Sequence, residues 1–295
     1  MSRDSTLRTF LVALLLCLAC SFLVSATAVG LRERQDRNRA DAVRRNILKA
    51  AFPTELGDGT DFDAFFQSRG VDDLSSFFDS FVIRQAIRLK TGDVAEKPDE
   101  YDQLKASRRP GTSSDLDLSE LRELDVAGIK RREDVGWVYL VTAKGQPEKV
   151  ETIILPIRGY GLWSTLYGFL AIDSDSLDRG PTQATVRGLT FYQHGETPGL
   201  GGEVDNPAWK TLWIGKRIFD DEWQVLLSVT KSAEDASLHD VDALSGATIT
   251  SNGVSRMLDF WLGSNGYGPY LKRRASEHAN PDRQPSPAAK GEADG

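Results

Sequence analysis

The chain has 295 residues and 40% hydrophobic content, which fits one globular domain of ordinary size with appendages. Its formal net charge of −7 argues against nucleic acid as a partner, because nucleic-acid binding needs concentrated lysine and arginine. The two cysteines and three histidines have no metal-ligand spacing, so we expect no metal site, and an electron carrier in this chain would have to be organic.

The N-terminal segment contains an uncharged run at residues 10–31, after a short tail at residues 1–9. About 20 apolar residues suffice for a helix to cross a bilayer, so we predict a transmembrane helix over 10–31. Two other interpretations stay open. Ala26-Thr27-Ala28 is a small-x-small site typical of a cleaved signal peptide, and Cys20 loosely matches a lipoprotein cleavage site.

The charges beside this run bear on the side of the membrane. Arg3 and Arg8 precede it, and four arginines follow it: Arg32, Arg34, Arg37 and Arg39. This count favours a cytoplasmic position for the following domain, but long domains translocate largely regardless of flanking charge. Charge alone therefore leaves the orientation open.

Residues 32–136 are expected to form a membrane-proximal helix followed by a variable α/β region. In the helix, over residues 38–52, Val43, Ile47 and Ala51 recur four apart, which favours a stalk packed on its own domain over a helix lying on the membrane. Residues 89–118 are polar, and we expect an exposed connection with few core residues there.

Residues 137–272 carry most of the apolar pattern. Strand-like stretches lie at 137–142, 150–157, 168–172, 184–193 and 223–229. Strands and helices in irregular order predict an α+β fold, with a mixed or antiparallel sheet and flanking helices. The charged tail at 273–295 is expected to be disordered.

Two helices are expected among these strands. Asp205-Asn206-Pro207 has the pattern of a cap and first-turn proline, after which Trp209, Leu212 and Trp213 share one face. The second helix ends at Gly263, and its apolar face comprises Val254, Met257, Leu258, Trp261 and Leu262.

The segment at residues 242–253 is the most informative for function. It is small, polar and glycine-containing, and it runs directly into the second helix. Such a loop lets backbone approach a ligand, and the unpaired N–H groups and positive dipole end of a helix start favour a phosphate. Ordinary N-capping uses the same residue types, so composition allows a phosphate site without requiring one.

Within this segment, Ser245-Gly246-Ala247-Thr248, with Asp242 before it, resembles the flavinylation motif of the FMN-binding domain family. The resemblance implies a covalent FMN whose phosphate is joined to the Thr248 hydroxyl as a phosphoester. It also implies cofactor-binding roles for the other motif residues, Asp242, Ser245, Gly246 and Ala247. Thr250 is a nearby alternative that does not match the motif position.

Two further blocks, at residues 158–168 and 194–203, resemble the C subunits of sodium-translocating NADH:quinone reductases. This resemblance is dense from about 137 to 270, thin from 58 to 131 and absent after 273. The G subunits of Rnf electron-transport complexes share the flavinylation motif but usually lack the Leu162-Trp163-Ser164 sequence, so they are the second choice.

The block at 194–203 has two interpretations from its residues, a polar pocket edge with a tight turn at 198–202 or a solvent-exposed hairpin loop. The resemblance implies that it lies against the flavin ring, with cofactor contacts from His194, Glu196, Thr197, Leu200 and Gly201. Its glycines lack the strand–turn–helix context of a dinucleotide fingerprint, so we expect no nicotinamide site. We expect Trp163 and Tyr167 to be core residues rather than partner surface.

The resemblance implies a flavin-carrying electron-relay subunit of a membrane oxidoreductase. Its partners would be the other subunits and a flavin transferase for maturation, and no side chain need act as a catalytic acid or base. The expected location is a bacterial inner membrane, with the domain on the periplasmic side. The alternative from a different class is a membrane-anchored binding or assembly module without a cofactor.

Overall fold

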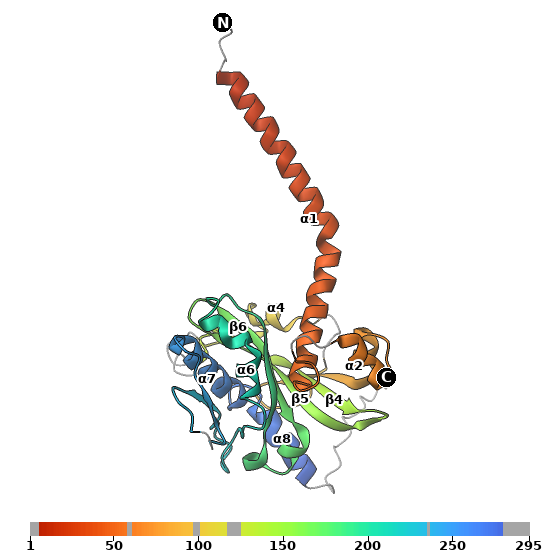
Figure 1. Cartoon of the computed structure of the whole chain (residues 1–295), viewed down its shortest axis with the longest axis vertical. Coiled ribbons are helices and arrows are strands. Elements are labelled where there is room, and N and C mark those ends of the chain that lie inside the picture. Colours follow the sequence, from red (N-terminus) through yellow and green to blue (C-terminus); the bar gives the residue numbers. More distant parts are fainter. Residues whose placement is uncertain (1–5, 58–60, 97–100, 117–124, 235–236, 280–295) are drawn as a thin grey trace, which may run out of the picture. The chain divides into compact units, whose positions relative to one another are not determined.

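The computed structural model describes residues 6–57, 61–96, 101–116, 125–234 and 237–279 (Figure 1). The chain divides into two compact units between Arg44 and Arg45. The first unit consists mainly of helix α1, which spans Thr6–Ala51 and whose last turns belong to the second unit.

Helix α1 contains the apolar run predicted from the sequence. Its most apolar window has a mean hydropathy of 2.5 and none of it is buried, so by length and composition α1 can cross a membrane. The membrane-proximal helix predicted over 38–52 is a continuation of the same 46-residue helix. No glycine or proline interrupts residues 31–52, and the helix ends just before Pro53.

The last turns of α1 pack against the rest of the second unit, to which they belong, as the stalk interpretation predicts. Ile47, Leu48, Ala50 and Ala51 are buried. The Arg187 side chain donates to the Ala51 carbonyl at 3.0 Å. Phenylalanines from the short helices α2 (Phe62–Arg69) and α3 (Leu74–Phe81) pack around Phe52 with edge-to-face ring geometry.

The centre of the second unit is a five-stranded antiparallel sheet in the order β1-β4-β5-β6-β7. Its strands are β1 (Val82–Arg88), β4 (Val135–Ala143), β5 (Gln146–Tyr160), β6 (Thr165–Asp173) and β7 (Val186–Gln193). Four of the predicted strands are confirmed, and so is the α+β class. The sheet uses residues on both sides of position 137, where the apolar pattern of the sequence begins.

The fifth predicted strand, 223–229, is wrong over most of its length. Only β8 (Ser228–Thr230) is a strand, and it pairs in parallel with β9 (Asp240–Asp242). A tight turn comes before it, in which the Asp220 carboxylate accepts hydrogen bonds from the N–H groups of Glu222 and Gln224. Trp223 in this turn has a φ of 65°, which an extended strand does not permit.

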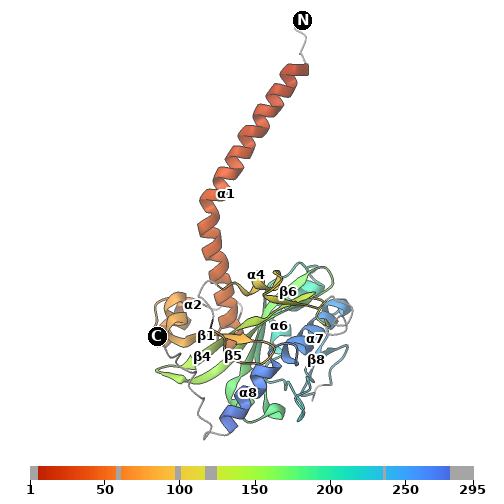
Figure 2. The ribbon, with the colours of Figure 1, turned by 180° about the vertical axis from the view of Figure 1, so that it is seen from behind.

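Helices α7 (Thr248–Leu262) and α8 (Gly268–Ala279) follow one another beside the sheet (Figures 1 and 2). The predicted apolar face of α7 is confirmed, and it packs on β5, where a Cβ on Gly159 would lie 2.6 Å from the Met257 side chain. Gly263 ends the helix, as predicted. Three further short helices are α5 (Ser174–Asp178), η2 (Pro181–Gln183) and η3 (Gly201–Asp205).

Helix α6 (Pro207–Thr211) begins where the sequence predicts, with the Asn206 side chain accepting from the Ala208 N–H at 2.9 Å. Trp209 and Trp213 are buried, but Leu212 is 41% exposed, so its placement on the same face was wrong. The helix has only five residues, and Leu212 already lies in the turn that follows it.

The predicted exposed connection over 89–118 is also wrong. It contains α4 (Gln103–Ser107) and β2 (Ser113–Asp115), and several residues are buried: Leu89, Ala95, Gln103, Ala106, Ser107, Ser113 and Leu116. The Gln103 amide is buried because it is matched on both sides: its Nε2 donates to Glu133, and its Oε1 accepts from the Trp137 N–H at 2.8 Å. A polar residue can therefore lie in the core when each of its groups has a partner.

The expectation of disorder from 273 onward is wrong for residues 273–279, which belong to α8. Arg273 pairs with Asp93 at 2.6 Å, Arg274 donates to Ser174, and Ala275 is buried. These contacts come from elements far away in the sequence, so composition alone did not reveal them. Residues 280–295 lie outside the described part of the chain.

A buried ion pair connects the region between β1 and β4 to the central strand of the sheet. The Arg158 Nη2 atom of β5 lies 2.6 Å from the Oε2 atom of Glu133 in β3 (Arg131–Glu133), and the two side chains are 8% and 0% exposed. Burial alone would lower the pKa of Arg158, but the carboxylate beside it outweighs that effect and raises the pKa. Arg158 also donates to the Arg131 carbonyl, so the pair is supported by further hydrogen bonds.

Removing one partner of this pair should be strongly destabilising, because the other charge stays buried. We expect Glu133→Ala to lower the free energy of unfolding of the full chain by about 3–5 kcal/mol, measured by denaturant titration in detergent. The control is Glu55→Ala, which removes a half-exposed carboxylate paired with Arg69 and should cost no more than about 1 kcal/mol. Equal losses in the two variants would contradict the assigned role of the buried pair.

Candidate functional site

The loop between β9 and α7 carries Ser245, Gly246 and Ala247 of the motif, leads to Thr248 at the helix start, and is anchored at its own start. The Asp242 carboxylate accepts a hydrogen bond from the Ala233 N–H at 2.8 Å. The backbone carbonyl of Asp242 accepts one from the Trp209 indole, also at 2.8 Å. Gly246 has a φ of 71°, and a Cβ there would lie 3.0 Å from Leu200. Glycine is therefore needed both for the turn and for the close approach of Leu200.

Helix α7 begins at Thr248 without a side-chain cap. Its N-cap residue is Ala247, which makes no side-chain capping hydrogen bond. The N-capping interpretation of this segment is thus wrong, since alanine has no acceptor to offer. The first N–H groups of the helix, together with its positive dipole end, stay suited to an anionic group.

The two threonines of the first turn have different surroundings. Thr248 is exposed, whereas Thr250 is 1% exposed and its hydroxyl donates to Glu196 at 2.7 Å. Two residues along a helix differ by about 200° in direction, so the two side chains leave α7 on opposite sides. Of these two hydroxyls, the one accessible from outside belongs to Thr248.

Glu196 joins this helix to the loop after β5. Its carboxylate accepts from the backbone N–H groups of Leu162, Trp163 and Ser164 at 3.0–3.3 Å, and from Thr250. Burial alone would raise the pKa of Glu196, but the hydrogen bonds from Thr250 and from the loop lower it below its ordinary value. The carboxylate is therefore held in its ionised form.

Two glycines leave the room that this carboxylate occupies. A Cβ on Gly201 would lie 2.6 Å from the Thr250 hydroxyl and 2.7 Å from Glu196, and a Cβ on Gly161 would also lie 2.7 Å from Glu196. Main chain from two loops therefore surrounds the carboxylate closely, and any larger residue at either position would displace it.

The other residues of the 194–203 block differ in what they contact. His194 Nε2 lies 2.8 Å from the Asp205 carboxylate, and His194 Nδ1 accepts from the Glu196 N–H. Thr197 is exposed, and its carbonyl accepts from the N–H groups of Leu200 and Gly202, which forms the predicted tight turn. The structure thus places Glu196, Leu200 and Gly201 beside the motif, whereas His194 faces Asp205.

Several exposed apolar side chains belong to the segments that meet here. They are Tyr160, Leu162, Trp163, Leu200 and Ile249, with exposed fractions from 38% to 67%. The prediction that Trp163 is a core residue was wrong: it is the most exposed of the five, because its loop projects beyond the sheet while its backbone is held by Glu196. Tyr167 is half-buried, with its ring 6.1 Å from that of Tyr192.

Sequence reasoning missed Leu162, Ile249 and the hydrogen bond from Thr250 to Glu196 as parts of this site. The helical period contained a signal for the positions of Thr250 and Ile249. Thr250 is four residues before Val254, on the buried face, and Ile249 lies off that face. The contribution of Leu162 depends on a hydrogen bond to a residue 34 positions away, which no local pattern reveals.

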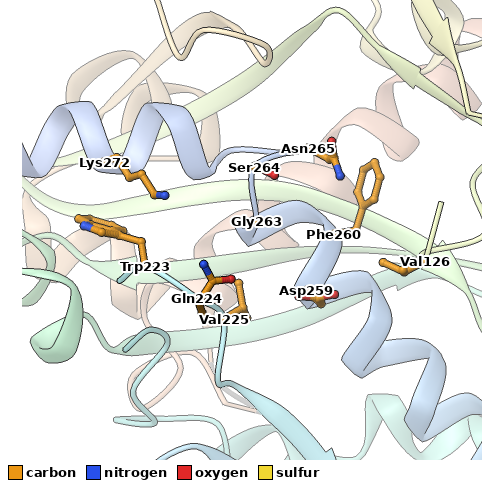
Figure 3. Close-up of a pocket in the computed structure, with 10 residues that line it drawn as sticks. All are labelled: Val126, Trp223, Gln224, Val225, Asp259, Phe260, Gly263, Ser264, Asn265 and Lys272. Atoms are coloured by element: carbon orange, nitrogen blue, oxygen red, sulfur yellow. The ribbon is translucent and has the colours of Figure 1, made fainter. Parts of the chain in front are cut away.

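A cavity of about 230 Å³ lies at the other end of α7, between Trp223, Asp259, Phe260 and Lys272 (Figure 3). Thr248 and Gly263 are 15 residues apart, or about 22 Å along the helix. The cavity is therefore separate from the motif. Among the described residues, no group of His, Cys, Asp and Glu side chains could hold a metal ion.

Comparison with known proteins gives a consistent result. The FMN-binding domain family matches residues 161–263. The chain is 43% identical over 276 residues to the C subunit of the Na(+)-translocating NADH-quinone reductase of Pseudomonas aeruginosa, covering 92% of this chain and 96% of that protein. It is 40% identical over 275 residues to the corresponding protein of Yersinia pestis, with 92% and 94% covered.

Solved structures agree with the sequence matches. The crystal structure of Shewanella oneidensis NqrC superposes with a TM-score of 0.67 at 31% identity, covering 81% of this chain and 99% of that one. The crystal structure of the C subunit of the Na(+)-translocating NADH-quinone reductase from Parabacteroides distasonis superposes with a TM-score of 0.54 at 25% identity, covering 82% and 96%.

The close packing around Glu196 yields a prediction about Gly201. An added methyl group must displace the Glu196–Thr250 pair, so we expect Gly201→Ala to lower the free energy of unfolding by about 1–3 kcal/mol. The control is Gly195→Ala in the same block, whose Cβ would meet Ser164 at an ordinary 3.4 Å and should change stability by less than about 0.5 kcal/mol. Denaturant titration of both variants decides the matter, and an unaffected Gly201→Ala protein would show that the packing is not as tight as described.

Proposed function

Because the chain belongs to the family of Na(+)-translocating NADH-quinone reductase C subunits, we propose that it holds FMN covalently on Thr248 and relays electrons between other subunits of such a complex. The observation that carries the proposal is the contrast between the two threonines of α7. The Thr248 hydroxyl is accessible at an uncapped helix start, and the Thr250 hydroxyl is buried in a hydrogen bond.

The residues around Thr248 fit a flavin phosphate. A phosphoester carries negative charge, which the unpaired N–H groups and positive dipole end of α7 favour. Gly246 and Ala247 present no bulky side chain, and Ser245 is exposed beside them. Asp242 holds the preceding loop in place through Ala233 and Trp209.

The exposed apolar side chains beside Thr248 are suited to a flavin ring. Leu162, Trp163, Leu200 and Ile249 offer an apolar surface that is otherwise open to solvent. Gly201 and Glu196 lie beneath this surface, Thr197 begins the turn that carries Leu200, and His194 accepts from the Glu196 N–H. FMN itself would supply the electron-transfer chemistry, and the protein would supply position and electrostatics.

A single flavin on one anchored domain needs a donor and an acceptor from other subunits. No nicotinamide fingerprint is present in the sequence, so electrons must reach the flavin from a partner. Helix α1 would confine the domain to the plane of the membrane and raise its effective concentration near that partner. Maturation would require a flavin transferase acting at the exposed Thr248.

The attachment site is tested by substitution. In cells that produce the flavin transferase, Thr248→Ala should abolish covalent flavin, because the accessible hydroxyl is gone. Thr250→Val should retain the flavin, since it removes only the buried hydroxyl. In-gel flavin fluorescence and the intact mass of both variants report the result, and flavin retained by Thr248→Ala but lost by Thr250→Val would move the site to Thr250.

The side of the membrane is tested by protease access. We expect the domain after α1 to lie on the periplasmic side of a bacterial inner membrane, although the arginines that flank the span favour the opposite side. Protease added to intact spheroplasts should then digest the domain. Full protection until the cells are lysed would place it in the cytoplasm instead.

The relay role is tested on the purified chain. Dithionite should reduce the flavinylated protein, but NADH should not, and quinone reduction by NADH should return only when the other subunits are added. Steady-state turnover of NADH with quinone by the isolated chain would contradict the relay. A chain that carries no reducible flavin would favour the membrane-anchored binding module.

A further inference from the structure

Glu196 is the one residue whose side chain contacts both the 162–164 loop and the first turn of α7 through hydrogen bonds described above. All the donors that the structure describes at its carboxylate are neutral: three backbone N–H groups and the hydroxyls of Ser164 and Thr250. Neutral donors hold the carboxylate in place without cancelling its charge. A buried negative charge thus persists at this position.

This charge lies directly behind the surface that would receive the flavin. Glu196 touches Thr250, which is only two residues, or about 3 Å of helix rise, from Thr248. Leu200 approaches Gly246 of the motif, and the next residue, Gly201, packs on the carboxylate. The loop that the carboxylate holds from behind presents Leu162 and Trp163 outward.

We propose that Glu196 is a positioning residue of the flavin site, which fixes the 162–164 loop against the first turn of α7 and lowers the reduction potential of the flavin. This inference rests on the proposed function, because it needs FMN at Thr248. It assigns to Glu196 an action through the protein and through its electric field, not a contact with the reacting atoms.

The physical reason is electrostatic. Reduction adds electrons to the flavin, and a fixed negative charge nearby makes that addition less favourable. Because the carboxylate is buried, dissolved salt screens it poorly. The low pKa of Glu196 keeps it charged across the ordinary pH range, so its effect should not vary with pH near neutrality.

The decisive variant is Glu196→Gln in the full-length flavinylated chain, which keeps the shape of the side chain and removes its charge. We expect its midpoint potential, measured by spectroelectrochemical titration, to lie above that of the wild type, with the shift maintained at high salt. The matched control is Glu222→Gln, the same change on the exposed turn beside the cavity at the far end of α7, which should leave the potential unchanged. A wild-type potential in Glu196→Gln with full flavin content would overturn the electrostatic part of the proposal.

The positioning part is tested without flavin, in a Thr248→Ala background. Amide hydrogen exchange at Leu162, Trp163 and Ser164 should be slow in Thr248→Ala and faster when Glu196→Gln is added, since the amide side chain cannot accept all the same bonds. Thr250→Val provides a milder second variant, and equal exchange rates in all three proteins would overturn the positioning role. If the intact mass shows no flavin on the wild-type chain, the proposed function is contradicted, and so is the predicted shift in potential. The exchange rates still decide the positioning role in that case.

Discussion

The Glu196 carboxylate holds together segments that lie far apart in the sequence. It accepts backbone N–H groups from the loop after β5 and the hydroxyl of Thr250, 54 residues along the chain. Burying an ionised carboxylate is costly unless hydrogen bonds replace its water, and here main chain and hydroxyl donors do so. Gly161 and Gly201 are required by the same interaction, because a side chain at either position would occupy the space of the carboxylate.

This arrangement also gives the two threonines of α7 different chemistry. Once Thr250 is committed to Glu196, α7 is fixed in rotation, and Thr248 must face outward. A helix start with alanine as its cap forgoes roughly 1 kcal/mol that a capping side chain would contribute. At the proposed flavin phosphate site, that loss has a use, since the N–H groups stay available for an anion.

The remainder of the domain supplies a rigid support for this edge. The Arg158–Glu133 pair lies in β5 and β3, and the Trp261 indole donates to the Arg158 carbonyl at 2.6 Å, which ties α7 to the same strand. The buried Tyr267 hydroxyl donates to the Trp137 carbonyl and accepts from Gln103. The polar region between β1 and β4 is therefore part of the core that holds α7, not a spacer beside it.

Features that depend on neighbouring residues could be predicted from the sequence. An uncharged run predicts the span in α1, stretches rich in aliphatic, β-branched and aromatic residues predict four strands of the sheet, and the helical period predicts the buried face of α7 up to Gly263. Which polar residues are buried and which apolar residues are exposed became known only with the folded chain. Gln103 is buried and Trp163 is exposed because their surroundings come from partners 30 or more residues away, and the burial of a side chain depends on those partners and not on its own polarity.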